Sequence, residues 1–443
     1  MRAAWWVAVG LLGCGDNLGA GDPYEPQSGS RLRLGWFTYD DGTRQLQQAT
    51  FHDRELGTPC MPRRWSDGNV YCTPEAWSTT FADDACTVEV GASPGGPTPA
   101  AFFIRTYSLG ATITPSRLHR RGARHPRLLQ EWRLEGGECR GPITRSGFEY
   151  FELRPATAVR LRRSEPMGDS RLALIVHTSD DGVRAPAAIR DTVIEDDCVP
   201  TRVTGSAAPI CVPTAAPRAS HFRNDVCTER IVTIGPGEDQ PITASLCEHS
   251  AGCTSFAHVA EEVSPYRVFA WSGDECVEVV LPLGSRAFAI GAALELAAMD
   301  RRIEPVAARR LDPIVLADGA MHVPDEALFD KTIGDECRLV EIAGVHRCVP
   351  GTDGPRFERY RLNSCAFPSS MIPLVIIDHA CDAADVLIAD ERLAFFTLGA
   401  AYDGVFYERS TCGAIAVPPG YSVCRTGFAV PIEMFPIATL LVD

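Results

Sequence analysis

The chain has 443 residues, a formal net charge of −15 and 17 cysteines, and 45% of its residues are hydrophobic. This length and composition suit a globular protein of roughly two to four domains with a sizeable core. The acidic balance argues against general nucleic-acid binding, because such a surface repels the phosphate backbone.

The amino end has the pattern of a secretory leader. Arg2 precedes an apolar run over residues 3–13, which is well short of the roughly 20 residues that span a bilayer. We therefore expect residues 1–13 to be a signal peptide. The ending Leu11-Leu12-Gly13-Cys14 resembles a bacterial lipobox. That resemblance implies that Cys14 is acylated and becomes the first residue of the mature protein. The alternative is an ordinary signal peptide with a chance cysteine.

Residues 14–30 are rich in Gly, Asp, Pro and Ser and lack apolar periodicity, which predicts a flexible lipidated tether. In enteric bacteria an aspartate after the lipidated cysteine is an inner-membrane retention signal. Gly15 stands there in this chain. We therefore expect an outer-membrane lipoprotein of the cell envelope, attached to the membrane through its lipid, with the periplasmic or surface face left open.

The cysteines recur with a long period. Cys60, Cys198 and Cys337 are 138 and 139 residues apart, and each opens a set of four cysteines with similar neighbours. The segments "YCTP", "ICVP" and "RCVP" surround the second position of the three sets. We expect three repeats of about 138 residues, over 31–165, 166–303 and 304–443.

Setting Cys14 aside leaves sixteen cysteines (17 − 1), an even number that predicts a disulfide framework in an oxidising compartment. Spacing alone does not decide the connectivity, since four cysteines already allow three pairings. We favour pairing the first with the second and the third with the fourth cysteine of each set, and joining the remaining four within their repeats. The expected pairs are Cys60–Cys72, Cys86–Cys139, Cys198–Cys211, Cys227–Cys276, Cys247–Cys253, Cys337–Cys348, Cys365–Cys412 and Cys381–Cys424.

The secondary structure is predicted to be β throughout. Short runs rich in aromatic and branched residues, such as "RLRLGWFTY" and "RLALIVHT", alternate with Gly, Pro, Asp and Ser. The best helical candidates are 292–303 and 383–394. Two all-β architectures fit this pattern. Short joints between repeats favour a six-bladed propeller with two blades per repeat, and the alternative is three tandem β-sandwich modules.

Two motifs contain residue types that could bind a metal ion, and each has a simpler explanation. The "DDG" turns at Asp40–Asp41 and Asp180–Asp181, with Asp318 in the third copy, present carboxylates that suit calcium, but the sequence also favours plain hairpin turns. "CEHSAGC" at 247–253 offers two cysteines and His249 to zinc, but a local disulfide fits an oxidising compartment better. We expect neither a metal site nor a cofactor.

The sharpest surface feature is the basic segment "RLHRRGARHPR" at 117–127. We expect a solvated loop, and the alternative is a loop that binds an anionic glycan, a phosphate or an acidic partner. Its arginines are Arg117, Arg120, Arg121, Arg124 and Arg127.

The chain has no G-x-S-x-G, H-E-x-x-H or P-loop motif, so we assign no catalytic residue. Its lipobox and its recurring "FADDAC", "FRNDVC" and "YRLNSC" segments resemble, as a type, the cysteine-patterned repeat lipoproteins of GC-rich Gram-negative bacteria such as myxobacteria. We favour a non-enzymatic, lipid-anchored envelope protein that is a scaffold or binds a glycan or an envelope protein. The alternative is a secreted hydrolase acting on polysaccharide or peptide on a propeller scaffold.

Overall fold

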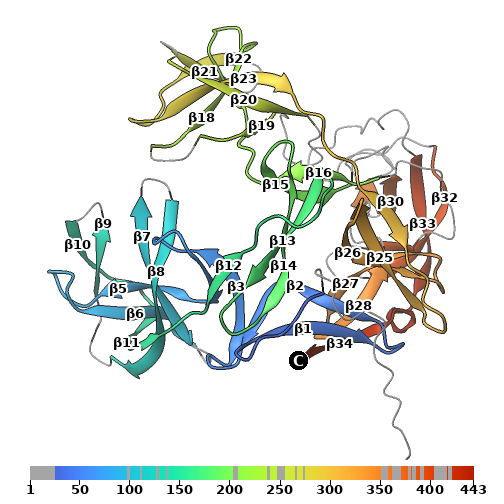
Figure 1. Cartoon of the computed structure of the whole chain (residues 1–443), viewed down its shortest axis with the longest axis horizontal. Coiled ribbons are helices and arrows are strands. Elements are labelled where there is room, and N and C mark those ends of the chain that lie inside the picture. The colour runs from blue at the N-terminus through green and yellow to red at the C-terminus, as the bar shows by residue number, and fades with distance from the viewer. Residues whose placement is uncertain are drawn as a thin grey trace, which may run out of the picture.

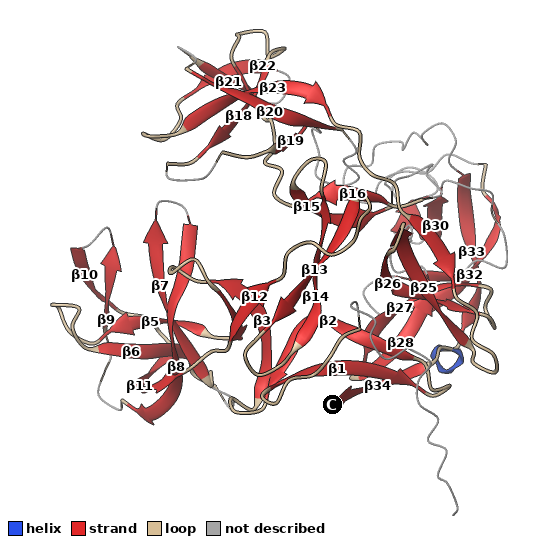
Figure 2. Ribbon diagram, viewed as in Figure 1, coloured by secondary structure: helices blue, strands red, loops and turns tan. Residues whose placement is uncertain are grey.

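The computed structural model is built almost entirely of strands (Figure 2), which confirms the all-β prediction. The one helical element described is a single 3-10 turn, η2 (Ile432–Met434). The structure describes residues 25–96, 100–109, 112–125, 128, 130–135, 138–202, 208–236, 240–246, 255–264, 267–272, 275–350, 358–361, 371–377, 381, 386–389, 394–403, 417 and 422–443.

Each repeat begins with a meander of four antiparallel strands. The first meander comprises β1 (Leu32–Tyr39), β2 (Arg44–Asp53), β3 (Thr58–Arg64) and β4 (Val70–Pro74). The second comprises β13 (Leu172–Thr178), β14 (Arg184–Asp191), β15 (Asp196–Thr201) and β16 (Ile210–Pro213). The third comprises β25 (Leu311–Asp318), β26 (Met321–Asp330), β27 (Asp335–Ile342) and β28 (Val345–Pro350).

A separate sheet follows each meander, and we call these sheets satellites one, two and three. Satellite one contains β5 (Trp77–Phe81), β6 (Glu89–Pro94), β7 (Phe102–Leu109), β8 (Thr112–Arg124), β9 (Glu131–Glu135), β10 (Glu138–Ile143) and β11 (Phe148–Ala156). Satellite two contains β17 (His221–Phe222), β18 (Arg230–Ile234), β19 (Thr243–Ser245), β20 (Phe256–Val263), β21 (Val268–Ser272), β22 (Glu275–Val279) and β23 (Arg286–Ala293). Satellite three contains β29 (Glu358–Arg361), β30 (Met371–Ile377), β31 (Val386–Ala389), β32 (Ala394–Ala401) and β33 (Ser422–Val430). Figure 1 shows the three satellites arranged around the meanders.

After each satellite the chain returns to the centre as one more strand. These return strands are β12 (Arg160–Arg163), β24 (Asp300–Ile303) and β34 (Ile437–Val442). β12 lies between β4 and β13, and β34 lies between β28 and β1. β24 pairs with β25, and the nearby residue Ala298 bridges to Ile210 in β16. The fifteen strands therefore close into one continuous sheet, which we call the hub.

The same polar contacts recur where each meander begins. An arginine before the first strand pairs with a buried aspartate at the end of the second strand and also donates to a carbonyl just before a return strand. The pairs are Arg31–Asp53 (2.8 Å), Arg171–Asp191 (2.8 Å) and Arg310–Asp330 (2.6 Å), and the carbonyls belong to Thr157, Glu295 and Met434. Each arginine thereby links the start of its meander to the end of a satellite.

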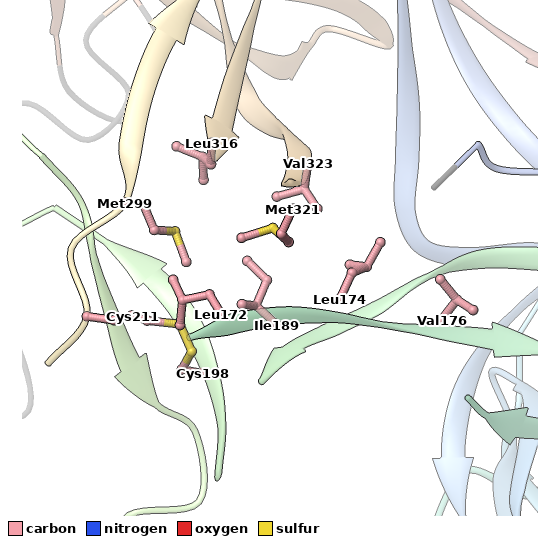
Figure 3. Packing of buried hydrophobic residues seen from close by; sticks show 11 residues of the cluster. Leu172, Leu174, Val176, Ile189, Cys198, Cys211, Met299, Leu316, Met321 and Val323 are labelled. Atoms are coloured by element: carbon pink, nitrogen blue, oxygen red, sulfur yellow. A yellow bond between two sulfur atoms is a disulfide. The ribbon is translucent and has the colours of Figure 1, made fainter. Parts of the chain in front are cut away.

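Three hydrophobic clusters fill the hub, one at each junction between repeats. Figure 3 shows the junction of repeats two and three, where Leu316 and Met321 point toward Leu172 and Ile189. The disulfide Cys198–Cys211 is buried in the same cluster. A disulfide that closes so short a loop stabilises a domain by about 3 kcal/mol in the chain-entropy model.

This arrangement differs from both architectures considered from the sequence. Propeller blades are separate sheets around a channel, and tandem sandwiches are separate modules, but here the meanders of all three repeats share one sheet. Neither helical candidate forms a helix over its described residues, since β23 reaches Ala293, β24 begins at Asp300 and β31 occupies Val386–Ala389. Pairing with neighbouring strands overrides the weak helical period of these segments.

Candidate functional site

The structure bonds the cysteines within repeats wherever it describes them. The bonds are Cys60–Cys72, Cys86–Cys139, Cys198–Cys211, Cys227–Cys276, Cys337–Cys348 and Cys381–Cys424. The first disulfide of each repeat lies in the hub, and the others described lie in the satellites. Cys14 and the expected pairs Cys247–Cys253 and Cys365–Cys412 lie outside the described residues, as does His249.

The "DDG" turns join the repeats to one another. In each turn one carboxylate accepts a hydrogen bond from the backbone nitrogen at the start of another repeat: Asp41 from Leu311, Asp181 from Leu32 and Asp318 from Leu172. The turn glycine Gly42 has a φ of +81°, a conformation that favours glycine. Over the described residues, no group of three or more His, Cys, Asp or Glu is arranged to hold a metal ion.

The predicted basic loop is the long strand β8 of satellite one, and its arginines are dispersed. Arg120 donates to the carbonyl of Glu55 and so docks the satellite on the hub. Arg121 lies over the Phe151 ring at 5.6 Å, and Arg124 pairs with Glu149 at 2.8 Å. Arg117 is exposed, and Arg127 lies outside the described residues. Three of the described arginines of this segment therefore have different partners.

The hub instead encloses a cavity of about 420 Å³ between the second strands of the three meanders. This volume falls within the range of roughly 300–1,000 Å³ that is typical of small-molecule sites. Apolar side chains such as Leu34, Leu174, Ile189 and Val323 form much of its wall, and Leu174, Ile189 and Val323 also belong to the cluster of Figure 3. All three repeats contribute to this cavity, so it exists only in the assembled hub.

A bulge in each second strand shapes the cavity wall. In each meander the second strand has residues that do not pair with the first strand, and these form the bulge. The bulges comprise residues 47–50 of β2, Ala187 of β14 and residues 325–327 of β26. Bulged residues leave the hydrogen-bonded ladder and re-aim their side chains. Gly35 on β1 makes room for the largest bulge, since a Cβ there would meet Gln47 Oε1 at 2.4 Å.

The three bulges differ in chemistry although the rest of the hub repeats itself. In and beside its bulge, repeat one presents glutamines and Thr50, repeat two presents Pro186 and alanines, and repeat three presents Asp325 and Glu326. The structural aspartates at the strand ends are the same in all three repeats, as described above. The repeats have therefore diverged at the positions that face the cavity.

Part of the polar lining is held in place by hydrogen bonds. Gln45 accepts a bond from the Tyr39 hydroxyl (2.7 Å) and donates to the carbonyl of Glu326 (2.6 Å). Burial raises the pKa of Tyr39, so its hydroxyl stays protonated and remains a donor. Gln47 Oε1 lies 2.9 Å from His52 Nε2. Burial lowers the pKa of His52, which favours the neutral ring at neutral pH.

On the opposite wall, Asp325 is held by Arg301, whose Nε lies 2.8 Å from Asp325 Oδ2. Arg301 also contacts Glu336, which in turn contacts Arg202 from repeat two. This chain of ion pairs holds the bulge of repeat three, which carries Asp325 and Glu326, against repeat two.

Other polar groups of the wall are available to a ligand. Among the described residues, the side chains of Gln48, Thr50 and Glu326 have no hydrogen-bond or ion-pair partner. Gln48 and Glu326 are also exposed to solvent, so the cavity opens where the bulges of repeats one and three meet. An amide donates and accepts, a hydroxyl does both, and a carboxylate accepts. This set suits a ligand with many hydroxyl or amide groups.

None of these cavity residues is predicted from the sequence. The one sequence feature that could have indicated the site is "QLQQ" at 45–48, where three glutamines lie close together after a "DDG" turn.

A model described as a family of unknown function (DUF7481) matches residues 7–435 of the chain. No curated protein and no solved structure matches it. In the described part of the chain, no helix has the length and apolar character needed to cross a membrane.

Proposed function

Because the chain belongs to DUF7481, a family of unknown function, we propose its function from its own residues. We propose a non-enzymatic, lipid-anchored protein of the bacterial outer membrane that binds a neutral oligosaccharide in the hub cavity. Residues 1–13 direct secretion, Cys14 carries the lipid, and the segment that follows tethers the hub to the membrane.

The observation that carries this proposal is the divergence of the three bulges around one cavity. The three repeats place glutamines, alanines and carboxylates around the same cavity, which offers a ligand three different surfaces. An oligosaccharide uses all three surfaces, because its hydroxyls donate to Glu326 and accept from Gln48, and its C–H faces pack on apolar side chains such as Pro186. The disulfides of the hub support rigidity, which lowers the entropic cost of binding.

Binding is tested with the full chain and a panel of neutral tetrasaccharides: cellotetraose, chitotetraose and maltotetraose. Isothermal titration is expected to show that at least one of them binds the unaltered protein. Ala187→Phe places a ring in the cavity and is expected to weaken that binding at least tenfold. Val193→Phe adds the same ring at an exposed position of the hub and serves as the matched control. Equal affinities of the two variants, or no binding to any tetrasaccharide, would contradict the proposal.

The anchor needs its own test, because it does not depend on the cavity. Mass spectrometry of the protein extracted from its native membrane is expected to find the mature chain beginning at Cys14 and carrying acyl mass. An unmodified Cys14, or a mature chain that begins elsewhere, would disprove the lipid attachment and leave the cavity proposal standing.

A further inference from the structure

A second polar site lies in satellite one, away from the hub cavity. Five of its strands close on themselves, because β5 pairs with β6 on one side and with β7 on the other. The ring of strands runs β5, β6, β11, β8 and β7 (Figure 1). Phe103 packs inside this ring of strands against Gly91, since a Cβ on Gly91 would lie 2.6 Å from the phenyl ring of Phe103.

His119 lies inside this ring of strands. It is the direct partner of Phe103 in the pairing of β8 with β7, so both side chains lie on the same face. His119 is only 6% exposed, and neither ring nitrogen has a hydrogen-bond partner among the described residues. A buried imidazole without partners is costly, and it indicates a site built for a polar group that the protein itself does not supply.

A carboxylate and two arginines surround this imidazole. Glu89 accepts a bond from Thr79 Oγ1 (2.6 Å) and lies 3.7 Å from Arg105 Nη1 and 4.0 Å from His119 Nε2. Arg105 is the direct cross-strand partner of Arg117. Burial lowers the pKa of His119, Glu89 opposes this effect, and the charges of Arg117 and Arg105 lower the pKa further. Both guanidinium groups therefore disfavour protonation of the imidazole.

The charge balance selects the ligand. Glu89 offsets one arginine, and Arg117 is exposed without an ion-pair partner among the described residues, which leaves the positive charge of Arg117 uncompensated within this cluster. A planar guanidinium binds a carboxylate through two parallel hydrogen bonds. Glu89, Thr79 and the imidazole nitrogens remain as partners for hydroxyl groups. We propose that this cluster of Arg117, Glu89 and His119 binds the carboxylate of an acidic sugar, independently of the hub cavity.

The test uses the full chain with its histidines labelled with ¹⁵N, and glucuronate as the probe. Titration is expected to shift the ring resonances of His119, while glucose, which lacks the carboxylate, leaves them in place. Arg117→Gln is expected to raise the dissociation constant for glucuronate at least tenfold. Arg124→Gln removes an exposed arginine from the same strand and is expected to leave the constant within twofold.

Three results would overturn this site. Equal binding of glucose and glucuronate would show that the carboxylate is not recognised, and equal binding by the Arg117→Gln and Arg124→Gln variants would show that it is recognised elsewhere. Tighter binding of glucose 6-phosphate than of glucuronate would contradict the preference for a single negative charge. The Ala187→Phe variant is expected to bind glucuronate normally, so failure of the hub cavity and failure of this site are distinguishable.

Discussion

Asp41 Oδ2 lies 2.7 Å from the backbone nitrogen of Leu311, 270 residues further along the chain. Asp181 and Asp318 repeat this contact around the hub, so each meander begins on a carboxylate from another repeat. The hub is therefore assembled from three parts that hold one another cyclically, and its cavity depends on all three.

Asp41→Ala is expected to destabilise the protein by about 1–2 kcal/mol, because the amide of Leu311 loses a charged acceptor. Burial alone would raise the pKa of Asp41, but hydrogen bonds from the backbone of Leu311 and Thr43 outweigh burial and lower it. The contribution of Asp41 is therefore present above about pH 4, the ordinary aspartate pKa, and is lost as the pH falls further. Urea unfolding at pH 7 measures the change. Asp40→Ala, at the exposed neighbour, is the control, and an equal loss in both variants would refute the role of the contact.

His177 is expected to make the hub sensitive to acid. It is 8% exposed, and burial together with the charge of Arg163 lowers its pKa to about 4. The unfolded chain, with a histidine pKa of about 6.5, binds more protons between these values, so stability falls as the pH drops from about 6.5 to 4, by up to about 3 kcal/mol.

His177→Leu is expected to flatten the dependence of unfolding free energy on pH over that interval, as measured by urea unfolding at several pH values. His258→Leu, at an exposed position, is the matched control and is expected to keep the slope. A slope that stays the same in His177→Leu would assign the acid sensitivity to other groups.

The disulfides are expected to differ in their accessibility to reductant. Cys60 and Cys72 are 1% and 0% exposed, whereas Cys86 and Cys139 are partly exposed. Because thiol–disulfide exchange requires access to a sulfur, mild reductant should open Cys86–Cys139 first. Alkylation followed by peptide mass spectrometry gives the order. Labelling of Cys60 and Cys72 before Cys86 and Cys139 would contradict the buried position of the hub disulfide.

Strand β34 is expected to hold the hub closed. It pairs with β1 over Gly35–Tyr39 and with β28 at His346 and Arg347. Deleting residues 437–443 exposes the edges of β1 and β28, which favours local opening and aggregation. Limited proteolysis is expected to cleave within β1 in the shortened chain. Removing Asp443 alone deletes its side-chain bonds with Trp36 and Arg44 and one backbone bond to Leu34, leaves the pairing of β34 with β1 and β28 in place, and is the control. Equal resistance of both chains to protease would show that β34 is dispensable.

The strands, the repeat and the turns can be predicted from the sequence because they are local or periodic features. The third turn depends on a contact that is not local. It has Ala317 where the other copies have a first aspartate, which weakens a calcium interpretation. The structure shows that Asp318, the residue it keeps, is the one that binds the next meander. The partner amide lies 146 residues away, so no local pattern reveals it.

The cavity is out of reach of sequence reasoning for a similar reason. Gln47, Ala187 and Asp325 share no residue type, and they become equivalent only because each lies in a bulge opposite the first strand of its own meander. A bulge depends on how two strands pair and not on the residues it contains. The fold also separates the described arginines of the basic segment at 117–127. Its arginines are adjacent in sequence, but Arg120 turns toward the hub and Arg124 toward Glu149.

The most direct test of the account is hydrogen–deuterium exchange of the full chain, read by mass spectrometry, with and without saturating cellotetraose, chitotetraose or maltotetraose. Binding in the hub cavity predicts slower exchange in peptides covering 45–51, 185–189 and 323–326 together, because all three bulges contact the same ligand. Exchange that is unchanged in these peptides, or slowed only in the satellites, would contradict the claim that the three repeats form one binding site.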